Sequence, residues 1–165
     1  MEKIAVFPGS FDPFTIGHKS IVSRGLKLFD KIIIAIGYNS NKPGFFALED
    51  RIMWINKVFG DNSKVTVDYF DGLTVDFCKK VGAKYLLRGL RTSADFEYER
   101  AIAQVNKKMF PDIESVFILT MPEHTPINST IVRDIIMHGG NAEKFLPKGI
   151  SIKYEDYLKN RNSNG

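Results

Sequence analysis

The sequence has few features that would suit a protein outside a reducing compartment. Its single cysteine, Cys78, cannot form an intramolecular disulfide, and the residues around it lack the spacing of metal ligands. No segment approaches the roughly 18 uninterrupted apolar residues of a membrane helix. The N-terminus leads directly from Lys3 into a strand-like segment, without the features of a secretory signal. We therefore expect a soluble, cytoplasmic protein in which Cys78 is a buried structural thiol.

The excess of positive over negative charge is also small. The chain has 23 Lys and Arg against 19 Asp and Glu, a net charge of +4. This surplus attracts anionic ligands but falls short of the basic pattern of a nucleic-acid-binding protein. No repeat, low-complexity tract or linker divides the 165 residues, a length that suits one domain. We predict a single domain over residues 1–159 and a disordered tail over residues 160–165.

Apolar, β-branched segments alternate with segments of helical spacing. The five strand-like segments are residues 4–7, 32–36, 65–69, 85–87 and 116–119. An apolar run as continuous as residues 32–36 is typical of a parallel strand buried on both faces. The pattern predicts an α/β fold, with a five-stranded parallel sheet covered by helices on both faces. Ligands of such sheets bind beyond the carboxyl ends of the strands, so function is expected in the loops that follow them.

The loop after the first strand has the composition of a phosphate-binding loop. Residues 8–18 read PGSFDPFTIGH, in which prolines and glycines impose an irregular path that opens a helix. Free amides and the helix dipole favour an anion there, and a protonated His18 would add two ring donors. Ser10 suits a hydrogen-bond donor to phosphate, because it lacks the G-x-S-x-G context of a hydrolase nucleophile. Alternatively, the glycines and prolines serve only the turn and His18 contacts no ligand.

Two further loops carry cations. Lys42 is the only cation of residues 37–43, and it is either a solvated lysine or a phosphate ligand. Arg88 and Arg91 follow the fourth strand in the run RGLRTSADFEYE, where a turn would aim both at one polyanion. A capped surface turn is the alternative for this run.

Two remaining loops have hydroxyl and amide side chains before a helix. Residues 123–130 read EHTPINST, and such residues at a helix start are either ordinary caps or an anion-binding site. Thr74, in the segment DGLT of residues 71–74, is either a ligand contact or a helix N-cap.

The motifs of these loops resemble those of a known family. The TIGH of residues 15–18 resembles the T/H-x-G-H signature of the nucleotidyltransferase superfamily, whose fold is dinucleotide-binding-like. The longer PGSFDPFTIGH, together with RGLR and DFEYE, is similar to bacterial phosphopantetheine adenylyltransferases. Ser10 replaces the family's usual threonine and keeps the hydroxyl, whereas INSTIVR departs from the family's I-S-S-T/S-x-V-R at Asn128. The resemblance covers residues 8–133 and continues into residues 145–147.

The resemblance implies an enzyme of coenzyme A biosynthesis. It would transfer AMP from ATP to 4′-phosphopantetheine, giving dephospho-coenzyme A and pyrophosphate, with Mg²⁺ bridging the triphosphate oxygens. The family also implies a homohexamer and feedback by coenzyme A at the same site. It assigns catalysis to Ser10, His18 and Lys42, substrate binding to Ser10, Lys42, Thr74 and Arg88, and no side chain to a metal. The ATP-binding residues that it implies are Ser10, Phe11, His18, Gly89, Leu90, Arg91, Glu99, His124, Thr125, Pro126, Ile127, Asn128, Ser129 and Thr130.

The expected chemistry needs no general base, because a phosphate monoester is already an anionic nucleophile at neutral pH. Related nucleotidyltransferases that act on nicotinamide mononucleotide, or that use CTP to activate an alcohol phosphate, are the rival enzymes. Thr15, Lys42 and the RGLR–DFEYE run argue against both. A nucleotide-binding regulatory module without catalysis is the alternative outside enzymes, and pyrophosphate release distinguishes it.

Overall fold

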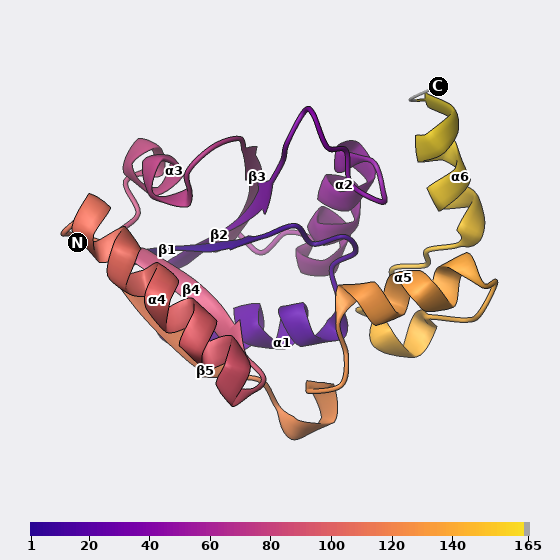
Figure 1. Cartoon of the computed structure of the whole chain (residues 1–165). Coiled ribbons are helices and arrows are strands. Elements are labelled where there is room, and N and C mark those ends of the chain that lie inside the picture. Colours follow the sequence, from indigo (N-terminus) through magenta and orange to yellow (C-terminus); the bar gives the residue numbers. More distant parts are fainter. Residues whose placement is uncertain (164–165) are drawn as a thin grey trace.

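The computed structural model describes residues 1–163, which form a parallel sheet, its covering helices and a smaller C-terminal helical region (Figure 1). The strands are β1 (Ile4–Gly9), β2 (Lys31–Gly37), β3 (Val65–Phe70), β4 (Tyr85–Leu90) and β5 (Glu114–Leu119). The α-helices are α1 (Ile16–Gly25), α2 (Leu48–Phe59), α3 (Thr74–Val81), α4 (Ser93–Met109), α5 (Ser129–Met137) and α6 (Tyr154–Ser163), and the short 3-10 helices are η1 (Pro122–His124) and η2 (Glu143–Phe145).

The sheet has the order β3-β2-β1-β4-β5, and every neighbouring pair is parallel. All five predicted strands are therefore confirmed. The chain builds outward from β1 through β2 to β3, then returns to place β4 on the other side of β1. The order thus reverses between β1 and β4, which is the point of an open sheet where a ligand crevice forms beyond the strand ends.

Helices cover both faces of the sheet, as predicted (Figure 1). On one face, Ile21 of α1 and Ile55 of α2 pack with the side chains of β2 that point toward them. On the other face, Phe77 and Cys78 of α3 pack with Val6 of β1 and its neighbours. Burial raises the pKa of the Cys78 thiol to about 11, which fits the predicted structural role of this residue.

The C-terminal region has an apolar cluster of its own. Trp54 and Phe46 pack there with side chains of α5, α6 and the segment between them. Helix α6 continues to Ser163, so the prediction of disorder from residue 160 is wrong for residues 160–163, and residues 164–165 lie outside the described part. The prediction failed because the tail's polar composition does not reveal that its first residues dock on the protein. Within residues 1–163, no helix has the length and apolar character needed to cross a membrane.

Candidate functional site

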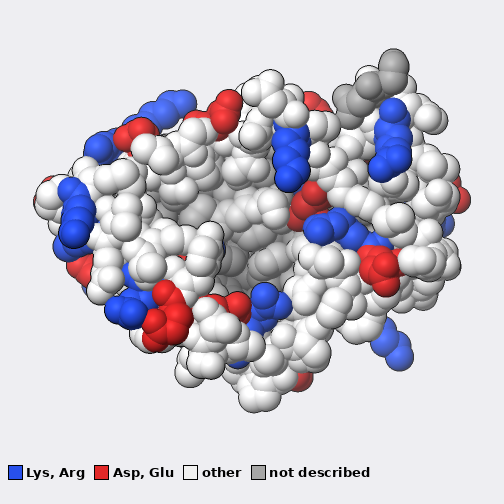
Figure 2. All heavy atoms as spheres, viewed as in Figure 1, with Lys and Arg blue, Asp and Glu red and all other residues white. Residues whose placement is uncertain are grey.

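A cavity of about 400 Å³ lies at the switch point between β1 and β4. Its walls come from the loop after β1, the first turn of α1, the end of β4 and the segment that leads into α5. Figure 2 shows this face of the molecule hollowed, with charged side chains around the rim. Twelve residues assigned from the sequence line the cavity, namely Ser10, Phe11, His18, Arg88, Gly89, Arg91, Glu99, His124, Ile127, Asn128, Ser129 and Thr130.

The central cavity continues into two further pockets. One contains Lys42 and shares Ser10 with the central cavity, and the other contains Thr74 and shares Arg88 and Glu99 with it. The four residues assigned to the substrate, Ser10, Lys42, Thr74 and Arg88, therefore lie along one groove. Thr74 is the first residue of α3, whose N-cap is Leu73, so the alternative of Thr74 as the N-cap is wrong.

Three residues assigned from the sequence do not line these pockets. They are Leu90, Thr125 and Pro126. Leu90 is buried at the end of β4, whereas Thr125 and Pro126 follow the 3-10 helix η1. The structure thus brings most of the assigned residues together but leaves these three beside the cavity.

His18 is fixed by the start of helix α1. Thr15 caps this helix, and its side chain accepts a hydrogen bond from the His18 backbone amide. In return, the Thr15 amide donates to Nδ1 of the His18 ring over 2.9 Å. A histidine therefore fills the capping-box position that glutamate or glutamine usually takes. Because Nδ1 accepts this bond, a neutral His18 carries its proton on Nε2, which leaves an Nε2–H donor.

Aromatic side chains enclose the His18 ring. Phe11 and Phe14 lie with ring centroids 5.0 and 5.3 Å from the imidazole. Phe11 adopts a φ of 45°, a left-handed conformation that is uncommon for a residue with a side chain and that occurs most often at functional sites. Its buried ring thereby forms part of the floor against which His18 rests.

His18 is neutral at physiological pH in the free protein. Burial, followed by the nearby charges of Arg91 and Arg88, lowers the His18 pKa from its ordinary value to about 4. Protonation would also break the bond from the Thr15 amide to Nδ1. A protonated ring would supply two donors, whereas the neutral His18 ring offers the cavity one donor. The sequence did not reveal the lowered pKa, because it does not show that the ring is buried or that Arg88 and Arg91, some seventy residues away, fold close to it.

Arg88 is held by an acidic partner. Its Nε and Nη2 donate to the two carboxylate oxygens of Glu99 over 2.8 and 2.6 Å, and its Nη1 donates to the Pro8 carbonyl over 2.7 Å. Glu99 is buried in α4, whereas the Arg88 side chain of this bidentate pair is 31% exposed. Arginine has five N–H groups, so two remain available to a ligand in the groove. Glu99 consequently acts through Arg88, by orienting it and balancing its charge.

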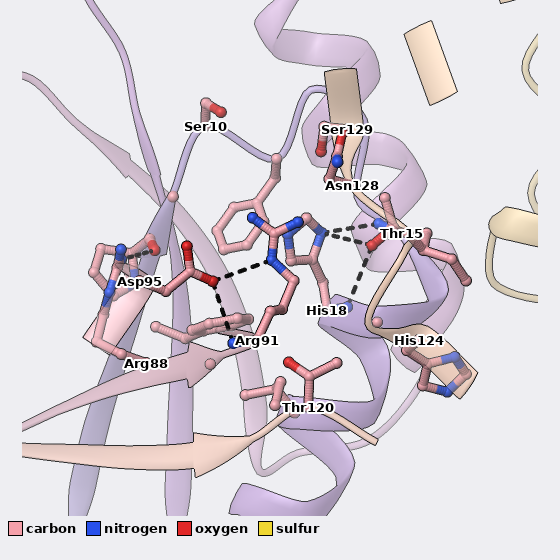
Figure 3. Close-up of a pocket in the computed structure, with 18 of the residues that line it drawn as sticks. Ser10, Thr15, His18, Arg88, Arg91, Asp95, Thr120, His124, Asn128 and Ser129 are labelled. Atoms are coloured by element: carbon pink, nitrogen blue, oxygen red, sulfur yellow. Dashed lines mark hydrogen bonds and ion pairs between the residues drawn. The ribbon is translucent and has the colours of Figure 1, made fainter. Parts of the chain in front are cut away.

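Arg91 lines the same cavity as His18 and pairs with Asp95 (Figure 3). Its Nε lies 3.4 Å from the Asp95 carboxylate, which also accepts a bond from the Arg91 backbone amide. Within residues 1–163, neither terminal nitrogen of Arg91 has a hydrogen-bond partner, so both are free to bind an anion. Asp95 thus orients the Arg91 side chain and leaves its two terminal nitrogens available to a ligand.

The N-terminus of α5 closes the cavity. Asn128 is the N-cap, and its Oδ1 accepts from the Ile131 amide over 2.9 Å. Asparagine caps helices as well as serine does, so the departure at this position preserves the cap. The Ser129 hydroxyl donates to the Pro13 carbonyl over 2.9 Å, which ties α5 to the first loop. The first amides of this helix, together with its dipole, favour an anion in the cavity.

Two residues that the sequence reasoning missed join the first loop to the Lys42 loop. Asp12 is buried, and its carboxylate accepts from the Phe45 and Phe46 amides over 2.6 and 2.9 Å. Arg51 of α2 is also buried, and its Nη1 donates to the Ser10 carbonyl over 2.8 Å. Asp12 had a detectable signal in its position within the loop motif. Arg51 had none, because it reads as an ordinary charged residue of an amphipathic helix.

Other missed residues line the central cavity. They are Thr15, Asp95, Tyr98 and Thr120, in addition to apolar and glycine positions. Thr120 directly follows β5, so the rule that sites form beyond strand ends could have found it. In residues 1–163, no cluster of three or more His, Cys, Asp or Glu side chains is arranged to hold a metal ion.

Comparison with known proteins shows which family the sequence matches. The sequence model of the family described as cytidylyltransferase-like matches residues 6–135. A protein of Flavobacterium psychrophilum named phosphopantetheine adenylyltransferase is 49% identical over 149 residues, covering 90% of this chain and 98% of its own. A protein of Christiangramia forsetii with the same name is 51% identical over 151 residues, covering 92% of this chain and 99% of its own.

Solved structures share the fold. A bifunctional NMN adenylyltransferase/ADP ribose pyrophosphatase of Francisella tularensis superimposes with a TM-score of 0.71 at 19% identity, covering 99% of this chain. The chain spans half the length of that protein. At this identity the likeness confirms the predicted fold class and carries no information about substrate.

Proposed function

Because the chain belongs to the phosphopantetheine adenylyltransferase family, within the cytidylyltransferase-like nucleotidyltransferases, we propose that its groove catalyses adenylyl transfer from ATP to 4′-phosphopantetheine. The products are dephospho-coenzyme A and pyrophosphate, in the biosynthesis of coenzyme A. The observation that carries this function is the convergence of the His18 ring, the open edge of Arg91 and the N-terminus of α5 on one cavity.

The reaction exchanges one phosphorus–oxygen bond for another. An oxygen of the phosphopantetheine phosphate forms a bond to the α-phosphorus of ATP, and the bond from the α-phosphorus to the bridging oxygen of pyrophosphate breaks. A phosphate monoester has its second pKa near 6, so most of it is a dianion at pH 7. The side chains therefore need to position the reactants and stabilise charge, and no residue needs to remove a proton.

Each polar group of the groove has a place in this reaction. The Ser10 hydroxyl and the Lys42 ammonium orient the attacking phosphate, because Ser10 lines both the central cavity and the adjoining pocket that contains Lys42. His18 donates its Nε2–H to the α-phosphate, where negative charge grows in the transition state. Arg91 and the N-terminus of α5 bind the β and γ phosphates, which leave as pyrophosphate.

The neutral state of His18 suits this role. A neutral imidazole holds its Nε2 proton far more tightly than an imidazolium does, so it does not transfer this proton to the reacting phosphates. The hydrogen bond from Nε2–H therefore persists as negative charge develops. The Thr15 amide fixes the tautomer, and the enclosing aromatic rings fix the ring plane. Preorganised donors of this kind typically contribute about a hundredfold to a thousandfold to turnover.

The phosphopantetheine arm occupies the pocket that contains Thr74. That pocket is lined by Phe70, Ile102 and Phe117 in addition to Thr74 and Arg88, so it offers apolar walls with a cation at its inner end. The two N–H groups that Arg88 retains are directed by its pairing with Glu99. An extended, mostly uncharged arm that ends in a phosphate matches this arrangement.

Magnesium enters as part of the MgATP substrate. Asp95 and Glu99 are the carboxylates that line the central cavity, and both accept bonds from arginines. Mg²⁺ prefers oxygen ligands and commonly relies on substrate phosphates and water. Bound mainly to triphosphate oxygens, Mg²⁺ would neutralise charge on the leaving pyrophosphate.

The family likeness further supports a cytoplasmic homohexamer regulated by coenzyme A. Side chains of α4 and the end of β5 leave apolar surface exposed, including Val105 and Leu119, which are 54% and 70% exposed. Such surface is typical of an interface between subunits. Coenzyme A shares the adenosine and pantetheine parts of the product, so it would compete for the same groove. Sedimentation analysis tests the hexamer, and inhibition kinetics test the feedback.

The activity is tested by pyrophosphate release from the purified protein with Mg²⁺. ATP is combined in turn with 4′-phosphopantetheine, nicotinamide mononucleotide and glycerol 3-phosphate, and CTP replaces ATP in parallel. We expect release only with ATP and phosphopantetheine. Release with another pair would overturn the substrate assignment. No pyrophosphate release in any reaction would overturn the enzymatic function.

A further inference from the structure

The loop that carries Lys42 is exposed along most of its length. Residues 39–43 are all exposed, and the Lys42 side chain forms no hydrogen bond or ion pair within residues 1–163. The loop is anchored at its start, where the Tyr38 amide donates to the Phe70 carbonyl over 2.8 Å. Its other anchor is the segment of residues 44–46, which immediately follows. The position of Lys42 therefore depends on how firmly residues 44–46 are held.

The first loop holds this segment from one side. The Asp12 carboxylate accepts from the Phe45 and Phe46 amides, and Phe46 is fully buried. Gly44 fits tightly here, since an added Cβ would lie 2.8 Å from Asp12 Oδ2 and 2.9 Å from Arg51 Nη2. These contacts use the backbone amides of the segment and leave its carbonyl groups to another partner.

Helix α6 supplies that partner. The Nδ2 group of Asn160 donates to the carbonyls of Gly44 and Phe45, each over 3.1 Å. One turn earlier, the Tyr157 ring stacks on the Phe45 ring with centroids 4.2 Å apart and planes 18° apart. Tyr157 is buried, so the contact is a packed one. Residues 157 and 160 lie on one face of the helix, as the i, i+3 spacing requires.

This face of α6 also borders the groove. The pocket that contains Lys42 is lined by Tyr157 and Asn160 as well as by Ser10 and Asp12. The family match of residues 6–135 ends before α6, so the motifs of the family do not account for either contact. The helix is thus placed to fix the end of the Lys42 loop at the border of the groove.

We propose that helix α6 is a positioning element for Lys42, acting through Asn160 and Tyr157. The proposal rests on the function proposed above and specifies how the acceptor phosphate is recognised. Small displacements of a positioned group lower the efficiency of a reaction sharply, so a loosened loop weakens the use of phosphopantetheine. ATP binds to the other end of the groove, through Arg91 and α5, and is affected little.

The main test is the isosteric variant Asn160→Asp, which removes both donors and places a carboxylate beside two carbonyl oxygens. We expect its KM for phosphopantetheine to rise about tenfold, the change that follows from losing roughly one charged or buried hydrogen bond. Its KM for ATP should change less than about twofold, because ATP binds at the other end of the groove. Tyr157→Ala removes the ring stack on Phe45 and should resemble Asn160→Asp.

The matched control is Lys159→Ala on the same helix. Lys159 is exposed, and its ammonium lies 3.4 Å from the Asp156 carboxylate at the surface. This variant should leave both KM values unchanged. Equal KM values in Asn160→Asp and Lys159→Ala would overturn the proposal, as would a parallel rise in the KM for both substrates. If Asn160→Asp does not fold, Asn160→Ala is judged by the same criteria.

A second measurement needs no substrate. Amide hydrogen exchange at Phe45 and Phe46 should be about tenfold faster in Asn160→Asp than in the Lys159→Ala control. Unchanged exchange would overturn the positioning role even in an active enzyme. Faster exchange in a protein without adenylyltransferase activity would instead overturn the proposed function while leaving the contact of α6 with the loop intact.

Discussion

Replacing His18 by glutamine removes the titrating ring while keeping a side-chain acceptor for the Thr15 amide. Glutamine is a usual residue at this position of a capping box, so the helix start is retained. At pH 7.5 the stability of His18→Gln should lie within about 1 kcal/mol of that of the unmodified protein. The difference between the two proteins should appear only as the pH falls.

The direction follows from the lowered pKa. The folded protein binds the His18 proton less tightly than the unfolded chain does, because the folded pKa is about 4 and the unfolded value is near 6.5. The favourable contribution is therefore complete above pH 6.5 and is lost as the pH falls from 6.5 to 4. At roughly 1.4 kcal/mol for each pKa unit, the total loss is about 3 kcal/mol.

Urea denaturation at a series of pH values between 7.5 and 4 measures this loss. Both proteins share all other titrating groups, so the difference between their free energies of unfolding reports His18 alone. We expect the unmodified protein to lose about 3 kcal/mol more than His18→Gln over this range. Parallel curves for the two proteins would refute the argument that the folded site keeps His18 neutral.

Three further changes test other parts of the site. Lys42→Ala should raise the KM for phosphopantetheine about tenfold or more through loss of a charged hydrogen bond, and steady-state kinetics that show a defect confined to ATP would contradict this. Arg91→Ala removes a nearby positive charge, so it should raise the pKa of the active-site histidine and weaken ATP binding; an unchanged histidine titration by NMR would contradict the assigned cause. Gly44→Ala places a Cβ 2.8 Å from Asp12 Oδ2 and 2.9 Å from Arg51 Nη2, both in buried side chains. It should destabilise the protein by about 1–3 kcal/mol in urea denaturation, and stability equal to that of the unmodified protein would show that the loops yield easily.

The framework of the molecule was predictable because burial leaves a periodic mark on the sequence. The apolar run of β2 is buried in the centre of the sheet, and the irregular loops follow the strand ends, as the parallel arrangement requires. The residues around the central cavity were found because their loops combine glycine, hydroxyl and cationic residues in family motifs. Local patterns of this kind need no knowledge of contacts between distant segments.

What the sequence did not reveal depends on such contacts. The pKa of His18 is lowered by burial and then by arginines of β4 and its following loop, and Arg51 is buried where it bonds to the loop after β1. Residue 160 was assigned to a disordered tail, since the partners of Asn160 are backbone carbonyls more than a hundred residues away. A polar side chain that bonds to distant backbone has the same appearance in a sequence as one that faces solvent.

The central claim is that the groove transfers AMP from ATP to phosphopantetheine in one step and releases pyrophosphate. Mass spectrometry of dephospho-coenzyme A, combined with an assay of pyrophosphate from the same reaction with MgATP and 4′-phosphopantetheine, tests it most directly. The account predicts equal amounts of both products at every time point and a large loss of both in His18→Gln. Pyrophosphate without dephospho-coenzyme A, or undiminished formation of both by His18→Gln, would contradict it.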